Sequence, residues 1–77
     1  MSANAVTGNQ IRAARCLAGI DQATIAKAAG LTRQALVAME RSGPRPVVSR
    51  ASSVARVLAA LGARGVMLVP NGVVLAE

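Results

Sequence analysis

The stretch from Gln22 to Met39 constrains the fold of this chain more than any other part of the sequence. Asp21 is suited to cap a helix, because its carboxylate can accept hydrogen bonds from the free amides of the first turn. Gly30 stands where a short helix can end in the left-handed conformation, which costs glycine little. Thr32 can cap a second helix immediately afterwards. The stretch therefore predicts two short helices joined by a tight turn.

Apolar residues recur along this stretch at helical spacing. Ile25, Ala26 and Ala29 fall on one face of the first helix, and Leu36 and Met39 fall on one face of the second. The small side chain at position 26 allows two helices that cross at a steep angle to approach closely. We expect both faces to be buried against the rest of the domain.

These residues resemble the helix-turn-helix pattern of the phage-repressor group of DNA-binding regulators (Cro and C1 type, XRE-like). The pattern has Gln first, Ala fifth, Gly ninth and apolar residues at four further positions, which here are Gln22, Ala26, Gly30, Ile25, Leu31, Leu36 and Met39. An Arg-Ala-Ala-Arg segment at 12–15 precedes the motif and Met-Glu-Arg-Ser-Gly at 39–43 closes it, as in that group. The resemblance covers roughly residues 7–62 and implies a transcriptional regulator.

Two further helices are expected on either side of the motif. Thr7 or Asn9 can cap the first, which runs to about Ala18 and has an inward stripe of Ile11, Ala14 and Leu17 or Ala18. A loop rich in Gly and Pro at 42–46 follows the motif, and Val47 and Val48 are expected to enter the core. Ser49 is the expected cap of the last helix, which spans about residues 50–61, with Gly62 as its stop and an apolar face of Val54, Val57, Leu58 and Leu61.

The tail predicts a β-hairpin, because apolar β-forming runs at 66–69 and 73–75 flank Pro70-Asn71-Gly72. A turn centred on Asn71 and Gly72 would need an amide at position 70 that proline lacks, so we expect a looser turn or one lost hydrogen bond. Isolated two-stranded ribbons are marginal in water, and a second subunit could cover the outer face. Dimerisation is therefore assigned to Val66, Leu68, Val69, Val73, Val74 and Leu75. The alternative is a hairpin folded back over its own domain.

The composition limits the remaining possibilities. A chain of 77 residues without Phe, Tyr or Trp is one domain with a small aliphatic core, and we divide it into a flexible tail (1–6), a DNA-binding domain (7–62) and the hairpin (63–77). The net charge of +6 suits a polyanion, although a merely solvated, arginine-rich surface is the alternative. Membrane attachment is disfavoured because no Lys or Arg occurs from Gly65 onward, and RNA binding is disfavoured because no aromatic residue can stack on bases.

The sequence offers little for enzyme chemistry. It has no histidine, one cysteine and three scattered acidic residues, which make neither a metal site nor an acid/base pair. We therefore expect no catalysis, no cofactor, no metal and no small-molecule ligand. Cys16 is expected to be a small core or half-buried residue. The single cysteine and the absence of a secretory signal or long apolar run indicate a cytoplasmic protein, associated with the nucleoid when bound to DNA.

Recognition of DNA has suitable residues at the start of the second motif helix, which enters the major groove in helix-turn-helix proteins. Arg33 can pair with guanine, Gln34 with adenine, and Val37 can contact a thymine methyl group. Phosphate contacts are assigned to four polar residues around that helix: Gln22, Thr32, Arg41 and Arg45. The alternative for these residues is ordinary solvated surface.

The resemblance also implies a structural salt bridge between Arg15 and Glu40, since that group pairs an arginine late in its first helix with a glutamate ending its third. We therefore predict a mainly α, four-helix Cro/C1-type domain with a C-terminal β-hairpin. Its expected function is sequence-specific binding of double-stranded DNA as a homodimeric repressor on a near-palindromic operator, with half-sites about 34–36 Å apart or a multiple of that. The alternative is an antitoxin or adaptor whose hairpin binds another protein.

Overall fold

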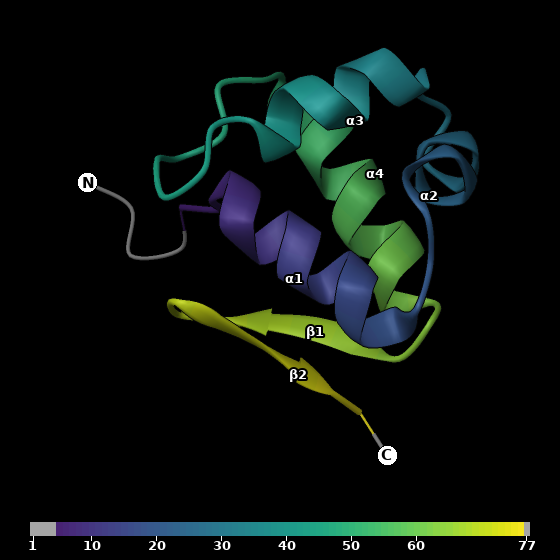
Figure 1. Ribbon diagram of the computed structural model, residues 1–77, viewed down its shortest axis with the longest axis vertical. Coiled ribbons are helices and arrows are strands. Elements are labelled where there is room, and N and C mark those ends of the chain that lie inside the picture. Colours follow the sequence, from purple (N-terminus) through teal and green to yellow (C-terminus); the bar gives the residue numbers. More distant parts are fainter. Residues whose placement is uncertain (1–4, 77) are drawn as a thin grey trace.

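The computed structural model describes residues 5–76, which form four helices followed by a β-hairpin (Figure 1). The helices are α1 (Gly8–Ala18), α2 (Gln22–Ala28), α3 (Arg33–Glu40) and α4 (Ala51–Gly62). The strands are β1 (Val66–Val69) and β2 (Gly72–Leu75), which pair antiparallel. The predicted mainly helical architecture with a C-terminal hairpin is confirmed.

Helix α1 begins at a capping box. The Thr7 side chain accepts a hydrogen bond from the backbone amide of Gln10 (3.1 Å). In return, the side-chain oxygen Oε1 of Gln10 accepts one from the backbone amide of Thr7 (3.0 Å). Thr7 is therefore the cap, and Asn9 lies inside the helix. The inward side chain near the end of α1 is Ala18, because Leu17 is 44% exposed. Cys16, expected to be at least half-buried, is exposed.

The α2–α3 segment follows the local chemistry of its sequence. Asp21 Oδ1 accepts a hydrogen bond from the Thr24 amide (2.8 Å), and Thr32 Oγ1 accepts one from the Ala35 amide (3.1 Å). Gly30, between the two helices, has a φ of 70°. This left-handed residue turns the chain between the helices without a penalty from a Cβ atom.

The core combines side chains from every helix and from β1. It is aliphatic throughout, apart from the thioether of Met39, and its members are Ile11, Ala14, Ile25, Ala26, Ala29, Leu36, Met39, Val57, Ala60, Leu61 and Val66. The faces that helical periodicity predicted to be buried in α2 and α3 are all represented.

The segment around α4 differs from the sequence prediction. Arg50, and not Ser49, occupies the N-cap position, and its side chain makes no capping hydrogen bond. Gly62 is the last residue of the helix rather than its stop, and the left-handed residue is Gly65 (φ 83°). Val48, which the sequence placed in the core, is 96% exposed.

The start of the described chain is held by the loop that follows α3. The Val47 amide donates a hydrogen bond to the Val6 carbonyl (2.7 Å), and Val6 and Val47 both pack against the core. Val6, which the sequence placed in a flexible tail, is therefore part of the folded domain. Residues 1–4 of that predicted tail lie outside the described residues, as does Glu77 at the end of the predicted hairpin segment.

The hairpin turn lies one residue earlier than an Asn-Gly turn would. Val69 pairs with Gly72, so Pro70 and Asn71 form the two-residue turn, and Asn71 has a φ of 61°. Proline fits the first central position of a turn, where its fixed φ is needed and its missing N–H is not. The predicted looser turn or lost hydrogen bond is therefore replaced by a shift of the turn.

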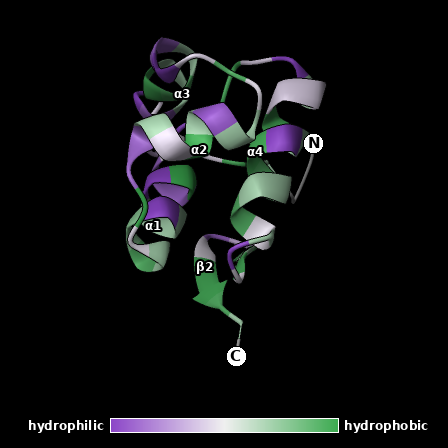
Figure 2. Ribbon diagram, turned by 90° about the vertical axis from the view of Figure 1, so that its right-hand side faces the viewer, coloured by the Kyte–Doolittle hydropathy of each residue, from purple (hydrophilic) through white to green (hydrophobic). Residues whose placement is uncertain are grey.

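The two faces of the hairpin have different environments. Val66, Leu68 and Val73, which the sequence assigned to dimerisation, pack against the helices of their own chain. The opposite face is exposed and apolar and carries Met67 (55% exposed) and Val74 (41% exposed). Figure 2 shows β2 as hydrophobic at the end of the molecule. Part of the predicted dimer interface is thus core. Val74 lies on the exposed face, together with Met67, which the sequence assignment did not include.

A substitution at Gly8 tests the close contact between α1 and the end of α3. A Cβ at this position would lie 2.5 Å from the Met39 carbonyl oxygen and 2.6 Å from the Glu40 carbonyl oxygen. We expect Gly8→Ala to lower the free energy of unfolding by about 1–3 kcal/mol, measured by urea denaturation. The control is Gly62→Ala, which meets no atom within 4 Å and should stabilise the helix by about 0.4–1 kcal/mol. Equal stability of both variants would contradict the packing described.

Candidate nucleic-acid interface

Helix α3 lies at the end of the molecule opposite the hairpin in both views (Figures 1 and 2). Helix α1 lies between them and contacts α3 as well as both strands. The surface around α3 is therefore separated from the exposed apolar face of the hairpin by the body of the domain. A duplex bound at α3 would leave the hairpin accessible.

The two faces of α3 differ in their environment. Leu36 and Met39 are buried in the core, which fixes the rotation of the helix about its axis. Arg33 and Gln34 are consequently exposed at the first turn, and Val37 is half-buried one turn later. The three residues assigned to base contacts thus share one accessible stripe of α3.

A shallow hollow joins this stripe to neighbouring residues of α2 and to the end of α3. Its lining is Gln22, Arg33, Gln34, Val37, Ala38 and Arg41. The structure therefore brings together five of the seven residues assigned to DNA contacts. Thr32 and Arg45 do not line this hollow: Thr32 caps α3, and Arg45 is exposed in the following loop.

A second hollow extends the same surface toward α1. It shares Gln22, Val37 and Arg41 with the first, and Arg12, Arg15 and Glu40 complete its lining. Arg12 was not among the sequence-assigned contacts. The signal for it was its position one helical turn before Arg15, which places the two arginines on the same side of α1. Only the packing of α1 against α3 shows that this side borders the candidate interface.

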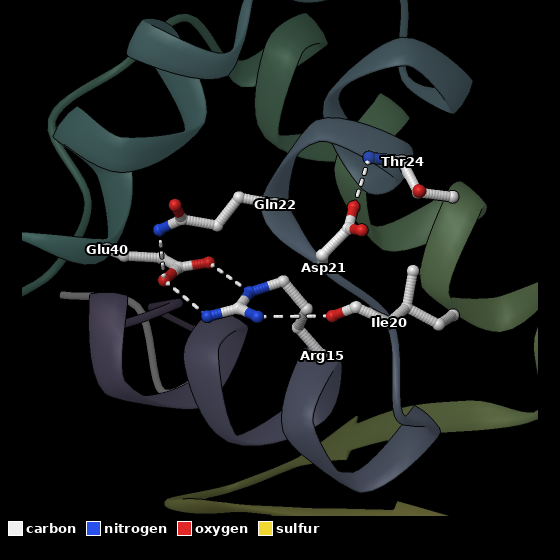
Figure 3. Close-up of polar contacts among 6 residues, drawn as sticks. All are labelled: Arg15, Ile20, Asp21, Gln22, Thr24 and Glu40. Carbon is white, nitrogen blue, oxygen red and sulfur yellow. Dashed lines mark hydrogen bonds and ion pairs between the residues drawn. The ribbon is translucent and has the colours of Figure 1, made fainter.

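Two residues that line the second hollow, Arg15 and Glu40, form an ion pair (Figure 3). Arg15 Nε donates to Glu40 Oε2 (2.9 Å), and Arg15 Nη2 donates to Glu40 Oε1 (3.2 Å). The arginine side chain is 15% exposed and that of the glutamate 6%. The hydrogen bond to Glu40 raises the pKa of Arg15, although burial opposes this effect. This bidentate geometry joins the C-terminal end of α3 to α1.

Two more contacts extend the pair into a network. Arg15 Nη1 donates to the Ile20 carbonyl (3.1 Å), which fixes the α1–α2 connection, and Gln22 Nε2 donates to Glu40 Oε1 (3.1 Å). A side-chain amide has two N–H donors, and one of those of Gln22 is used here. Gln22 is thus held by the protein while its second donor stays available to a phosphate oxygen.

The charge of the surface is set by arginines without acidic partners. Among residues 5–76, the one ion pair is that of Arg15 with Glu40. Arg12, Arg33 and Arg41 are exposed, and no salt bridge compensates their charges. Asp21, at the start of α2, has a lowered pKa, because the backbone amide and the hydroxyl of Thr24 donate hydrogen bonds to its carboxylate. The carboxylate of Asp21 therefore serves to cap α2.

A cluster of metal ligands and a membrane-spanning helix are both absent from the described part of the chain. Within residues 5–76 no group of three or more His, Cys, Asp or Glu side chains is placed to hold a metal ion. No helix in this range has both the length and the apolar character needed to cross a membrane.

Comparison with known proteins gives one match. A family model described as helix-turn-helix matches residues 11–60, which include α2, α3 and most of α1 and α4. Searches of curated proteins and of solved structures gave no match.

Removing one member of the ion pair tests whether it holds the interface together. We expect Glu40→Met to lower the free energy of unfolding by about 3–5 kcal/mol, because the Arg15 charge would stay largely buried without its partner. The double variant Arg15→Met, Glu40→Met should cost less than the single variant, measured by urea denaturation. Additive costs in this double-mutant cycle would show that the pair is not energetically coupled.

Proposed function

Because this chain belongs to the helix-turn-helix family of Cro/C1-type, XRE-like DNA-binding regulators, we propose that it is a sequence-specific repressor acting as a homodimer. Its proposed operator is near-palindromic, and residues 7–62 are the DNA-binding domain. The observation that carries this proposal is the exposure of Arg33 and Gln34 at the capped N-terminal turn of α3, whose other face is locked into the core.

The proposed base contacts follow from the chemistry of that turn. The guanidinium of Arg33 has a planar pair of donors that matches guanine O6 and N7, and the amide of Gln34 can pair with adenine N6 and N7. Val37, half-buried beside them, offers a methyl surface to thymine. Since these side chains lie on one stripe of one helix, they would read neighbouring base pairs in the major groove.

The proposed phosphate contacts surround this stripe. Gln22, Thr32, Arg41 and Arg45 were assigned from the sequence, and we add Arg12, which lines the hollow that contains Gln22 and Arg41. Such contacts supply affinity and orientation without reading sequence. Positions on α1, on α2, at both ends of α3 and in the following loop would fix the angle at which α3 enters the groove.

Repression is the simplest mechanism for such a binder. A dimer that covers a promoter sequence blocks access of RNA polymerase, which requires no ligand and no further contact. A two-fold symmetric dimer would present its two α3 helices to half-sites about 34–36 Å apart or a multiple of that, so operator symmetry follows from protein symmetry.

The double variant Arg33→Ala, Gln34→Ala tests base recognition. The binding sequence is first selected from a random double-stranded DNA library, and affinity is then measured by fluorescence anisotropy. We expect each lost bidentate contact to cost about 1–3 kcal/mol on the selected sequence, with little change on unrelated DNA. Arg64→Ala, which removes a charge between α4 and β1, is the control and should keep the sequence preference. An unchanged preference in the double variant would overturn the assignment.

The variant Arg41→Gln tests the phosphate contacts. Loss of one contact should lower the slope of log affinity against log salt concentration by about 0.9, equally for selected and unrelated DNA. Arg64→Gln carries the same change in net charge at the other end of the molecule and should leave the slope unchanged. Equal slopes for the two variants would show that Arg41 acts only through the overall charge of the protein.

A further inference from the structure

Strand β2 has an edge that its own chain leaves uncovered. Within residues 5–76 the sheet has two strands, so β2 pairs with β1 on one side alone. Exposed strand edges are usually protected by charged residues, proline or a bulge. No charged residue occurs in residues 65–76, and β2 itself, Gly-Val-Val-Leu, contains no proline. This edge is therefore open to pairing with another strand.

The register shows which backbone groups that edge presents. The Ala76 amide donates to the Gly65 carbonyl (2.6 Å), so residues 65 and 76 form a hydrogen-bonded pair. Pairs in an antiparallel ladder alternate between hydrogen-bonded and non-hydrogen-bonded types. Two residues further along, the pair of Met67 with Val74 is then hydrogen-bonded as well. The N–H and C=O groups of Val73 and Leu75 consequently point away from β1, to the free edge.

We propose that β2 pairs with β2 of a second copy of this chain, forming a continuous four-stranded antiparallel sheet. Val73 lies opposite Leu75 of the other copy, so that the outward groups of both strands are matched. Val74 then lies on the two-fold axis, facing its own counterpart as a non-hydrogen-bonded pair. This inference rests on the proposed homodimer and specifies its interface.

Edge pairing also orients the DNA-binding surfaces correctly. The two-fold axis between antiparallel strands is perpendicular to the sheet, so the helices that cover one face of each hairpin lie on the same side of the four-stranded sheet. Helix α1 contacts both strands, and α3 lies beyond α1 (Figure 1). Both α3 helices would therefore be on the same side of the dimer, as binding to one duplex requires.

Stacking of two hairpins face to face would have the opposite result. It would cover Met67 and Val74, but it would place the helices of the two copies on opposite sides of the stacked sheets. Charge gives a second reason for contact at this segment. Each copy carries a net charge of +6, and residues 65–76 contain no charged side chain, so two copies repel each other least when they meet there.

A cross-linking experiment tests the register. In a Cys16→Ser background, which removes the exposed native thiol, Val74→Cys should form a disulfide-linked dimer in a glutathione redox buffer. The two Cα atoms at position 74 would be about 4.5 Å apart, within the range for a disulfide. The control is Met67→Cys on the same exposed face, whose counterpart would be three strand spacings, or about 14 Å, away. Cross-linking of Met67→Cys but not Val74→Cys would support stacking and overturn edge pairing.

A pair of charge variants tests the same interface without a covalent bond. Val74→Lys would place two ammonium groups side by side on the axis, and we expect it to raise the dimer dissociation constant at least about tenfold in sedimentation equilibrium. Met67→Lys adds the same charge to the same exposed face, but on β1, and should leave dimerisation unchanged. Circular dichroism verifies that both variants fold. Equal dissociation constants for the two variants would overturn the inference.

The outcomes separate this inference from the proposed function. If the protein binds a palindromic sequence as a dimer while Val74→Cys stays uncross-linked, edge pairing is wrong and the repressor proposal stands. If Val74→Cys cross-links but no DNA sequence is selected, the interface stands and the proposed operator binding fails. A parent protein that is monomeric both alone and on DNA would overturn edge pairing and direct attention to a different protein as the partner of the hairpin.

Discussion

The bidentate pair of Arg15 and Glu40 is the constraint on which the geometry of this domain depends. It crosses from α1 to the last residue of α3, and through Gln22 and the Ile20 carbonyl it includes the start of α2 and the preceding connection. Three helices that share a small aliphatic core, without a single aromatic side chain, could slide against one another at modest cost. A directional polar network fixes their positions where hydrophobic contact alone is permissive. The geometry of the candidate interface therefore depends on an interaction that does not itself need to touch DNA.

The sequence predicted best those features that depend on short-range chemistry. The caps at Asp21 and Thr32 and the left-handed Gly30 need only neighbouring amides and a residue without Cβ, so local patterns were sufficient. The predicted hairpin turn was one residue too late, because Asn-Gly is a strong turn signal but Pro70 fits the first central position of a turn at Pro70-Asn71. Ser49 and Val48 were misassigned because the path of the loop after α3 is set by distant contacts, such as the hydrogen bond from the Val47 amide to Val6. Nothing adjacent in the sequence specifies that pairing.

In the candidate interface, too, some residues could be placed from the sequence and others only from the tertiary structure. Periodicity alone placed Arg33 and Gln34 on the exposed face of α3, because Leu36 and Met39 had to be buried. The position of Arg12 beside Gln22 and Arg41 required the packing of α1 against α3, which no spacing along the chain reveals. The double use of Gln22, as a donor to Glu40 and as a candidate phosphate contact, is likewise a property of tertiary structure.

The first turn of α1 connects the two ends of the molecule. Gln10 Nε2 donates to the carbonyls of Val69 (2.8 Å) and Gly72 (3.2 Å), which close the hairpin turn. Two residues earlier, the Gly8 amide donates to Ser42 Oγ (3.0 Å), just beyond the C-terminal end of α3. The same helical turn thus holds both the hairpin and the C-terminal end of α3. Because Gln10 is buried, this connection is shielded from water and the hairpin cannot rotate freely against α3. A dimer formed through β2 would therefore transmit its symmetry to the two α3 helices through a rigid body, so that the spacing of the half-sites is fixed by the fold and not by a flexible linker.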